Sequence, residues 1–134
     1  METKDILIID DDRDLTRSLK ALLEDQQYHV DIANDTQTGM EKFEARKPDL
    51  LILDVMMDSD MEGHKLALAI KQDPENMEVP ILVITGMLDT MGVNIRDAFE
   101  DVDKLPFVAM LDKPFTTEEL LSSVKQLMAE TMDV

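Results

Sequence analysis

Short apolar runs alternate along the chain with longer segments in which apolar residues recur every three or four positions. Four of the five runs are nearly continuous, which is typical of strands buried on both faces of a parallel sheet. The second run mixes apolar and polar residues. The pattern predicts strands at residues 5–10, 28–33, 49–54, 80–85 and 106–111.

The intervals between these runs have helical periodicity. Helices are predicted after Asp12, from Thr36, over residues 62–72 and 91–101, and after Thr116. We expect Asp12 and Thr36 to cap the first two helices, because their short side chains can accept hydrogen bonds from the N–H groups of a first turn. The last helix begins with Thr-Thr-Glu-Glu at residues 116–119, which is a capping box.

Strand and helix thus alternate five times, which predicts an α/β fold with a parallel sheet and right-handed crossovers. We expect a doubly wound, flavodoxin-like (βα)5 three-layer sandwich with strand order 2-1-3-4-5. A length of 134 residues fits one hydrophobic core. The expectation is therefore a single domain over residues 1–134, with its core at about residues 4–130 and no output domain.

Composition narrows the classes of partner. Thirteen basic and thirty acidic residues give a formal charge of −17, and such a surface repels nucleic acids and anionic membranes. No apolar stretch approaches the ~18 residues of a membrane span, and the N-terminus lacks a signal-peptide pattern. We therefore expect a cytoplasmic protein with no direct nucleic-acid binding and no membrane insertion. The absence of cysteine excludes disulfides and thiolate metal sites.

Carboxylate, hydroxyl and ammonium side chains stand at the C-terminal ends of four of the predicted strands. Asp10 and Asp11 follow the first, Asp54 ends the third, Thr85 ends the fourth and Lys113 follows the fifth. Ligands of open α/β sheets bind beyond the carboxyl ends of the strands, where the strand order reverses. In the predicted order that point lies between the first and third strands, so the three carboxylates would meet there.

Three converging carboxylates repel one another, and a hard divalent cation such as Mg²⁺ removes that repulsion. An aspartate is also a nucleophile towards phosphorus, and phosphoryl transfer needs in-line placement and neutralised charge. The ammonium of Lys113 and the hydroxyl of Thr85 suit the oxygens of a phosphoryl group. The residues therefore favour phosphoryl chemistry at an aspartate.

Four stretches now resemble a known family: Ile-Leu-Ile-Ile before Asp10, Leu-Leu-Ile-Leu before Asp54, Val-Ile before Thr85, and residues 111–115 around Lys113. In this order they are similar to the response regulator receiver domain of two-component signalling, in its stand-alone form. The likeness covers about residues 4–130. It implies that Asp54 takes a phosphoryl group from a histidine kinase or histidine phosphotransfer protein. It also implies a signalling receiver that catalyses only its own phosphorylation and dephosphorylation.

The resemblance also implies a cofactor, Mg²⁺ or Mn²⁺. Asp11, Asp54 and the backbone carbonyl of Met56 would bind the cation directly, whereas Asp10 would act through water. The family's downstream partner is a protein that the sequence does not name. A homodimer formed on phosphorylation is a further expectation.

The resemblance implies that Thr85, Met110 and Pro114 carry the response to phosphorylation. Thr85 would bond the phosphoryl group, and Lys113 would pair with it, oriented by a cis bond to Pro114. The family often has Tyr or Phe where this chain has Met110. A methionine fills variable space, so we expect a weaker or different switch at that position.

Two alternatives remain at this point. A haloacid dehalogenase-type phosphatase also uses a strand ending in Asp-x-Asp, which Asp10 and Asp12 imitate, together with a Thr and a Lys. That interpretation leaves Asp54 without a role, and a phosphatase would turn over external substrate. A receiver-fold interaction module that is not controlled by phosphorylation is the other alternative, although the intact set of site residues argues against it.

Overall fold

The computed structural model describes residues 3–54, 62–85 and 108–132. Its strands form one parallel sheet in the order β2-β1-β3-β4-β5, which confirms the predicted fold class and strand order. The strand bounds lie within two residues of the predicted ones. They are β1 Asp5–Ile9, β2 His29–Ala33, β3 Leu50–Asp54, β4 Ile81–Thr85 and β5 Val108–Asp112.

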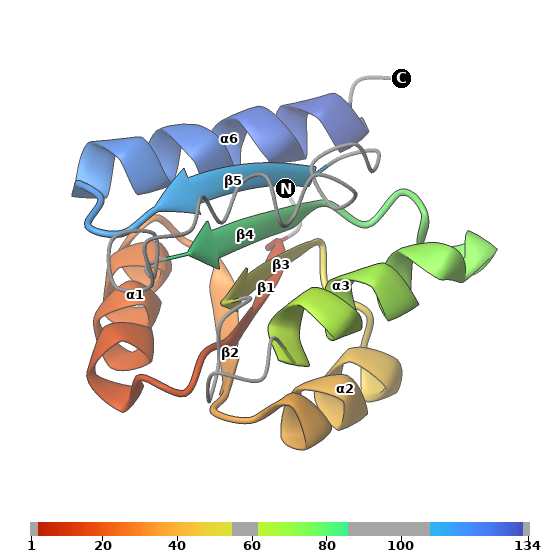
Figure 1. Cartoon of the computed structure of the whole chain (residues 1–134). Coiled ribbons are helices and arrows are strands. Elements are labelled where there is room, and N and C mark those ends of the chain that lie inside the picture. The colour runs from red at the N-terminus through yellow and green to blue at the C-terminus, as the bar shows by residue number, and fades with distance from the viewer. Residues whose placement is uncertain (1–2, 55–61, 86–107, 133–134) are drawn as a thin grey trace.

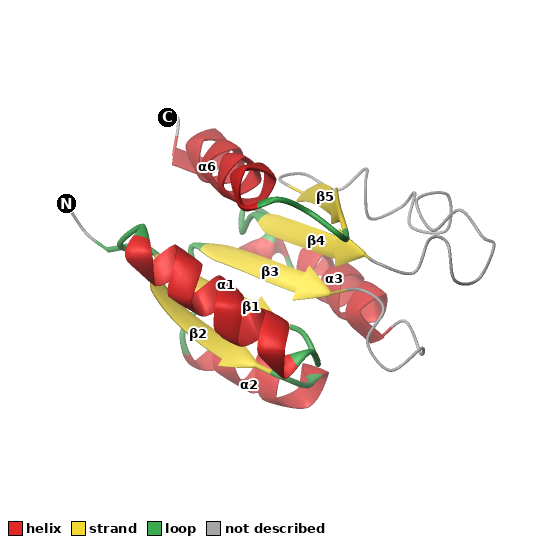
Figure 2. Ribbon diagram, turned by 90° about the vertical axis from the view of Figure 1, so that its left-hand side faces the viewer, coloured by secondary structure: helices red, strands yellow, loops and turns green. Residues whose placement is uncertain are grey.

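Helices cover both faces of this sheet and make the three expected layers (Figure 1). The described helices are α1 Arg13–Asp25, α2 Thr36–Ala45, α3 Glu62–Gln72 and α6 Thr117–Met132, with a short 3-10 turn η2 at Pro74–Asn76. Figure 2 shows α1 and α6 on one face and α2 and α3 on the other. The helix predicted at residues 91–101 lies outside the described residues. Within the described ranges, no helix is long and apolar enough to cross a bilayer.

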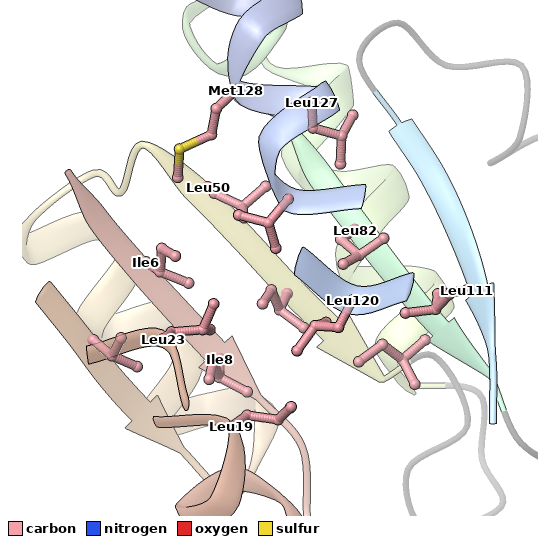
Figure 3. Packing of buried hydrophobic residues seen from close by; sticks show 14 residues of the cluster. Ile6, Ile8, Leu19, Leu23, Leu50, Leu82, Leu111, Leu120, Leu127 and Met128 are labelled. Carbon is pink, nitrogen blue, oxygen red and sulfur yellow. The ribbon is translucent and has the colours of Figure 1, made fainter. Parts of the chain in front are cut away.

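The continuous apolar runs of the strands serve two separate cores. Successive side chains of a strand point to opposite faces of the sheet. Ile6 and Ile8 of β1 accordingly pack with Leu19 of α1 and Leu120 of α6, as Figure 3 shows. Leu7 and Ile9 point the other way, into the core beneath α2 and α3. Burial on both faces thus explains why the strands are not amphipathic.

Helices α1 and α6 begin with the predicted caps. The N–H of Leu15 donates to Oδ1 of Asp12 at 3.0 Å, so Asp12 caps α1. The capping box of α6 is also formed. The N–H of Glu119 donates to Oγ1 of Thr116 at 3.0 Å, and the N–H of Thr116 donates to Oε1 of Glu119 at 3.4 Å. Local sequence alone was sufficient for both caps, because each donor lies three residues from its acceptor.

The prediction that Thr36 caps α2 is wrong. Asp35 is the cap, and its Oδ1 accepts the N–H of Thr38 at 2.7 Å. The reason lies in the backbone: Asp35 is extended, with φ −153° and ψ 163°, whereas Thr36 is already the first helical residue. Hydrogen bonds from the N–H and hydroxyl of Thr38 hold the pKa of Asp35 below its usual range.

Helix α2 approaches β1 closely at Gly39. A Cβ placed on Gly39 would lie 2.5 Å from Cδ1 of Ile9, which is far inside van der Waals contact. Ile9 is fully buried and directly precedes Asp10. The glycine therefore lets α2 pack against the last residue of β1, beneath the strand end that carries Asp10.

A buried lysine ties the end of α3 to the segment that leads into β4. Lys71 is only 4% exposed. Its Nζ donates to the carbonyl oxygen of Met77 at 2.8 Å and to the carbonyl oxygen of Val79. Burial lowers the pKa of Lys71 to about 8, since a buried ammonium loses its hydration. The two carbonyl acceptors offset part of that loss.

We expect Lys71→Met to lower the free energy of unfolding by about 2 kcal/mol, because the carbonyl oxygens of Met77 and Val79 lose a donor while the aliphatic stem stays packed. Urea denaturation followed by circular dichroism would measure the change. Lys65→Met, an exposed position on the same helix, is the matched control and should change stability little. Equal denaturation midpoints for the Lys71 variant and the wild type would contradict the expectation.

Candidate functional site

The ends of β1 and β3 bring three carboxylates together. Ile9 of β1 is paired with Leu53 of β3, so the residues that follow them, Asp10 and Asp54, lie side by side at the sheet edge. Carboxylate oxygens of Asp10, Asp11 and Asp54 all lie within 4.8 Å of one another. Asp10 and Asp54 are buried, whereas Asp11 is exposed. The predicted meeting of these three side chains therefore occurs, with one open side at Asp11.

Lys113, which follows the edge strand β5, supplies a positive charge to this cluster. Strand β4 lies between β5 and β3, so the long side chain of Lys113 spans the end of β4. Its Nζ lies 3.3 Å from Oδ2 of Asp10 and 3.6 Å from Oδ2 of Asp54. The Lys113–Pro114 peptide bond is cis, as the resemblance implied.

The electrostatics show an excess of negative charge around Asp10. Burial raises the pKa of Asp10 to about 6, and the charge of Asp54 adds to that rise. The N–H of Asp12, which donates to Oδ1 of Asp10 at 2.9 Å, and the ammonium of Lys113 both oppose it. Burial by itself would lower the pKa of Lys113, but the charges of Asp54 and Asp10 outweigh it and raise that pKa. The ammonium of Lys113 therefore does not fully offset the effects that raise the pKa of Asp10.

This donor set fits Mg²⁺ or Mn²⁺. Both are hard cations that prefer oxygen ligands, and Mg²⁺ is commonly held by one or two carboxylates with waters and phosphate oxygens completing the shell. Asp10 and Asp54 offer buried oxygens, and Asp11 offers an exposed one. The raised pKa of Asp10 gives the physical reason, because a cation would stabilise the ionised carboxylate that burial disfavours.

The other predicted site residues are only partly described. The backbone of Thr85 ends β4 and pairs with Asp112, but its side chain lies outside the described part of the chain. Met56 also lies outside it. Met110 sits in β5 opposite Val83 and packs half-buried against the core beneath α2 and α3. The roles predicted for Thr85, Met56 and Met110 stay predictions.

Sequence reasoning missed Asn34, which follows β2. Its Nδ2 donates to the main-chain carbonyl oxygen of Asp10 at 2.8 Å and lies 3.2 Å from Oγ1 of Thr16. An asparagine after a strand is an ordinary turn residue, so the sequence carried no signal for this contact. The contact exists because β2 lies beside β1, which places the two strand ends together.

Comparison with known proteins identifies the class. Residues 6–125 match the model of the response regulator receiver domain. The chain therefore belongs to this family of phospho-accepting signalling domains. The match includes Asp10, Asp11, Asp54, Thr85 and Lys113 within its bounds. It does not favour the phosphatase or the interaction module without phosphorylation.

Individual relatives agree with this class. The chain is 35% identical over 128 residues to the response regulator MprA of Mycobacterium leprae and 33% identical over 125 residues to the response regulator ArlR of Staphylococcus saprophyticus. These alignments cover 94% and 92% of this chain, but 51% of each relative. The chain thus spans about half the length of the curated relatives it matches.

Solved structures show the same fold. A CheY-like response regulator receiver domain protein of Methanospirillum hungatei superposes with a TM-score of 0.80 at 28% identity, over 98% of both chains. The signal receiver domain of a histidine kinase from Syntrophus aciditrophicus gives a TM-score of 0.82 at 24% identity, over 98% of this chain and 95% of that one. The second likeness, at its lower identity, shows the fold alone.

Proposed function

We propose that Asp54 is the phosphoryl acceptor of this receiver domain, and that a histidine kinase or histidine phosphotransfer protein is the donor. The observation that carries the proposal is the convergence of Asp54 with Asp10, Asp11 and Lys113 at the ends of neighbouring strands. Asp54 ends β3, which lies between β1 and β4 in the sheet.

The proposed reaction is an in-line displacement at phosphorus. A carboxylate oxygen of Asp54 forms the new P–O bond, and the P–N bond of the donor's phosphohistidine breaks, with its electron pair returning to the imidazole. Lys113, now 3.6 Å from Oδ2 of Asp54, can contact a phosphoryl oxygen after a small movement of its flexible stem. The ammonium of Lys113 then neutralises part of the negative charge of the transferred phosphoryl group.

A divalent cation completes the site. Asp11 and Asp54 would hold it directly with the backbone carbonyl of Met56, and Asp10 would act through water. When bound, Mg²⁺ supplies neutralisation of the phosphoryl oxygens and of the clustered carboxylates. Under this proposal the chain's enzymatic activity is confined to its own phosphorylation and dephosphorylation.

The response would spread from Asp54 along β4 and β5. Thr85 would bond the phosphoryl group, and Met110 and Pro114 would adjust on the neighbouring strand and loop. Met110 is half-buried, and its unbranched thioether can repack with little strain. The downstream protein partner and a dimer formed on phosphorylation remain predictions of this proposal.

Intact-protein mass spectrometry after incubation with Mg²⁺ and acetyl phosphate tests the assignment of Asp54. We expect one added phosphoryl group on the wild type and none on Asp54→Ala, because the variant lacks the carboxylate that we propose as the acceptor. Asp14→Ala removes an exposed carboxylate from the first turn of α1 and should leave the adduct intact.

Two results would contradict the proposal. One is an adduct that survives in Asp54→Ala. The other is a wild type that takes no phosphoryl group from acetyl phosphate or from any phosphorylated histidine kinase offered with Mg²⁺. Continuous release of phosphate that depends on Asp10 but not on Asp54 would instead point to a phosphatase.

A further inference from the structure

The side chain of Asn34 links three segments at the base of the acidic site. Its Nδ2 donates to the carbonyl oxygen of Asp10 at 2.8 Å and contacts Oγ1 of Thr16 at 3.2 Å, while its Oδ1 accepts from Arg13 at 3.4 Å. The hydroxyl of Thr16 donates in turn to the carbonyl oxygen of Arg13 at 3.1 Å. One amide therefore joins the end of β1, the first turn of α1 and the start of the β2–α2 connection.

The hydrogen bond from Asn34 to the Asp10 carbonyl also restrains the next residue, Asp11. A peptide unit is planar, so the carbonyl of Asp10 and the N–H of Asp11 are parts of one rigid plate. Holding the carbonyl oxygen restrains the rotation of that plate, and the plate carries Cα of Asp11, the atom from which the Asp11 side chain projects. Asp11 is exposed at the open side of the site, where packing does little to orient its side chain.

We propose that Asn34 is a positioning residue for divalent-cation binding, which orients the carboxylate of Asp11 by holding the Asp10–Asp11 peptide. This inference rests on the cation site of the proposed function and adds a residue that the family resemblance did not supply. Groups that orient metal-binding carboxylates commonly change metal affinity by about 10–100-fold when they are removed. Asn34 acts through the backbone, so the effect belongs at the lower end of that range.

A purely structural role makes a different prediction. Main-chain hydrogen bonds already join these segments: the N–H of Asp10 donates to the carbonyl of Ala33 at 3.1 Å, and the N–H of Thr16 donates to the carbonyl of Asp12 at 3.0 Å. If Asn34 only reinforces them, its removal lowers stability and leaves the affinity of the folded protein for a cation unchanged. Cation affinity and stability must therefore be measured separately.

The test is titration of the purified chain with Mn²⁺, followed by the electron paramagnetic resonance signal of free Mn²⁺, below the unfolding transition of every variant. We expect Asn34→Ala to bind Mn²⁺ about tenfold more weakly than the wild type. Thr16→Val is the matched control, because it removes one partner of the Asn34 amide while retaining the contact with the Asp10 carbonyl. It should keep Mn²⁺ affinity within about twofold of the wild type, even where its thermal stability falls.

Three outcomes would overturn the inference. Asn34→Ala could bind Mn²⁺ as tightly as the wild type. Thr16→Val could weaken binding as much as Asn34→Ala, which would show that the effect comes from disruption of the first turn of α1. A wild type that binds no Mn²⁺ would remove the cation site altogether. The readout does not involve phosphoryl transfer, so failure of Asp54 to accept a phosphoryl group would leave this result standing and is a separate failure.

Discussion

Lys113→Met is expected to lower the free energy of unfolding of the metal-free protein by about 3 kcal/mol, since removing one partner of a buried ion pair leaves the other charge without compensation. Nζ of Lys113 lies 3.3 Å from Asp10 and 3.6 Å from Asp54, both of which are buried. The lysine side chain is 27% exposed, so solvent screens part of the interaction. For that reason the expected value lies at the lower end of the range for buried pairs.

Urea denaturation in EDTA would measure this change, and Lys125→Met on the exposed side of α6 is the control for loss of a lysine charge. A double-mutant cycle with Asp10→Asn makes the test specific. When Asp10 is already neutral, removal of Lys113 takes the ammonium away from one carboxylate instead of two, so its effect should shrink. Additive effects of the two substitutions would show that Lys113 does not stabilise the protein through its ion pair with Asp10.

Asp10→Asn is expected to have the opposite sign and to raise the stability of the metal-free protein at pH 7. Burial raises the pKa of Asp10 from 3.8 to about 6, so keeping the carboxylate ionised in the folded state costs free energy. At about 1.4 kcal/mol per pH unit, that difference corresponds to about 2–3 kcal/mol. Asparagine has nearly the same shape and keeps an oxygen that can accept the N–H of Asp12.

The pH dependence gives this prediction its sign. Because the pKa of Asp10 is higher in the folded state, the folded protein binds more protons than the unfolded chain between pH 3.8 and about 6. The stability of the wild type therefore falls as the pH rises through this window. The stability of Asp10→Asn minus that of the wild type should be near zero below pH 4 and reach its full value above pH 6. The comparison cancels the titration of groups that the two proteins share.

Mg²⁺ should narrow the difference in stability between Asp10→Asn and the wild type. A ligand that binds only the folded state stabilises it in proportion to its affinity, and the ionised carboxylate of Asp10 strengthens that affinity. We therefore expect Mg²⁺ to raise the melting temperature of the wild type more than that of Asp10→Asn. A stability difference that does not change with pH or with Mg²⁺ would contradict the assignment of Asp10 as a buried carboxylate whose ionised form lowers stability and is stabilised by a cation.

The sequence could predict some residues of the site and not others, and the difference depends on whether a residue stands at the end of a recognisable strand. The convergence of these side chains could be predicted because Asp10, Asp11, Asp54 and Lys113 stand at the ends of recognisable strands, and parallel strands end at one edge of the sheet. Asn34 could not be predicted, because its acceptor lies 24 residues away in the chain. The cap of α2 was misplaced by one residue, since Asp35 and Thr36 are both good capping residues and only the backbone conformation distinguishes them.

The sequence by itself determined the layered α/β fold, the order of its strands and the set of strand-end residues. These features follow from local periodicity and from the narrow choice of topologies open to a parallel sheet. The tertiary structure decided the energetics. Only the packing of the sheet shows that Asp10 is buried beside Asp54 and close to the ammonium of Lys113, and that Asn34 donates to the carbonyl of the Asp10–Asp11 peptide. Burial and distances between strands are long-range quantities, and they set the pKa of Asp10 and the orientation of the Asp10–Asp11 peptide.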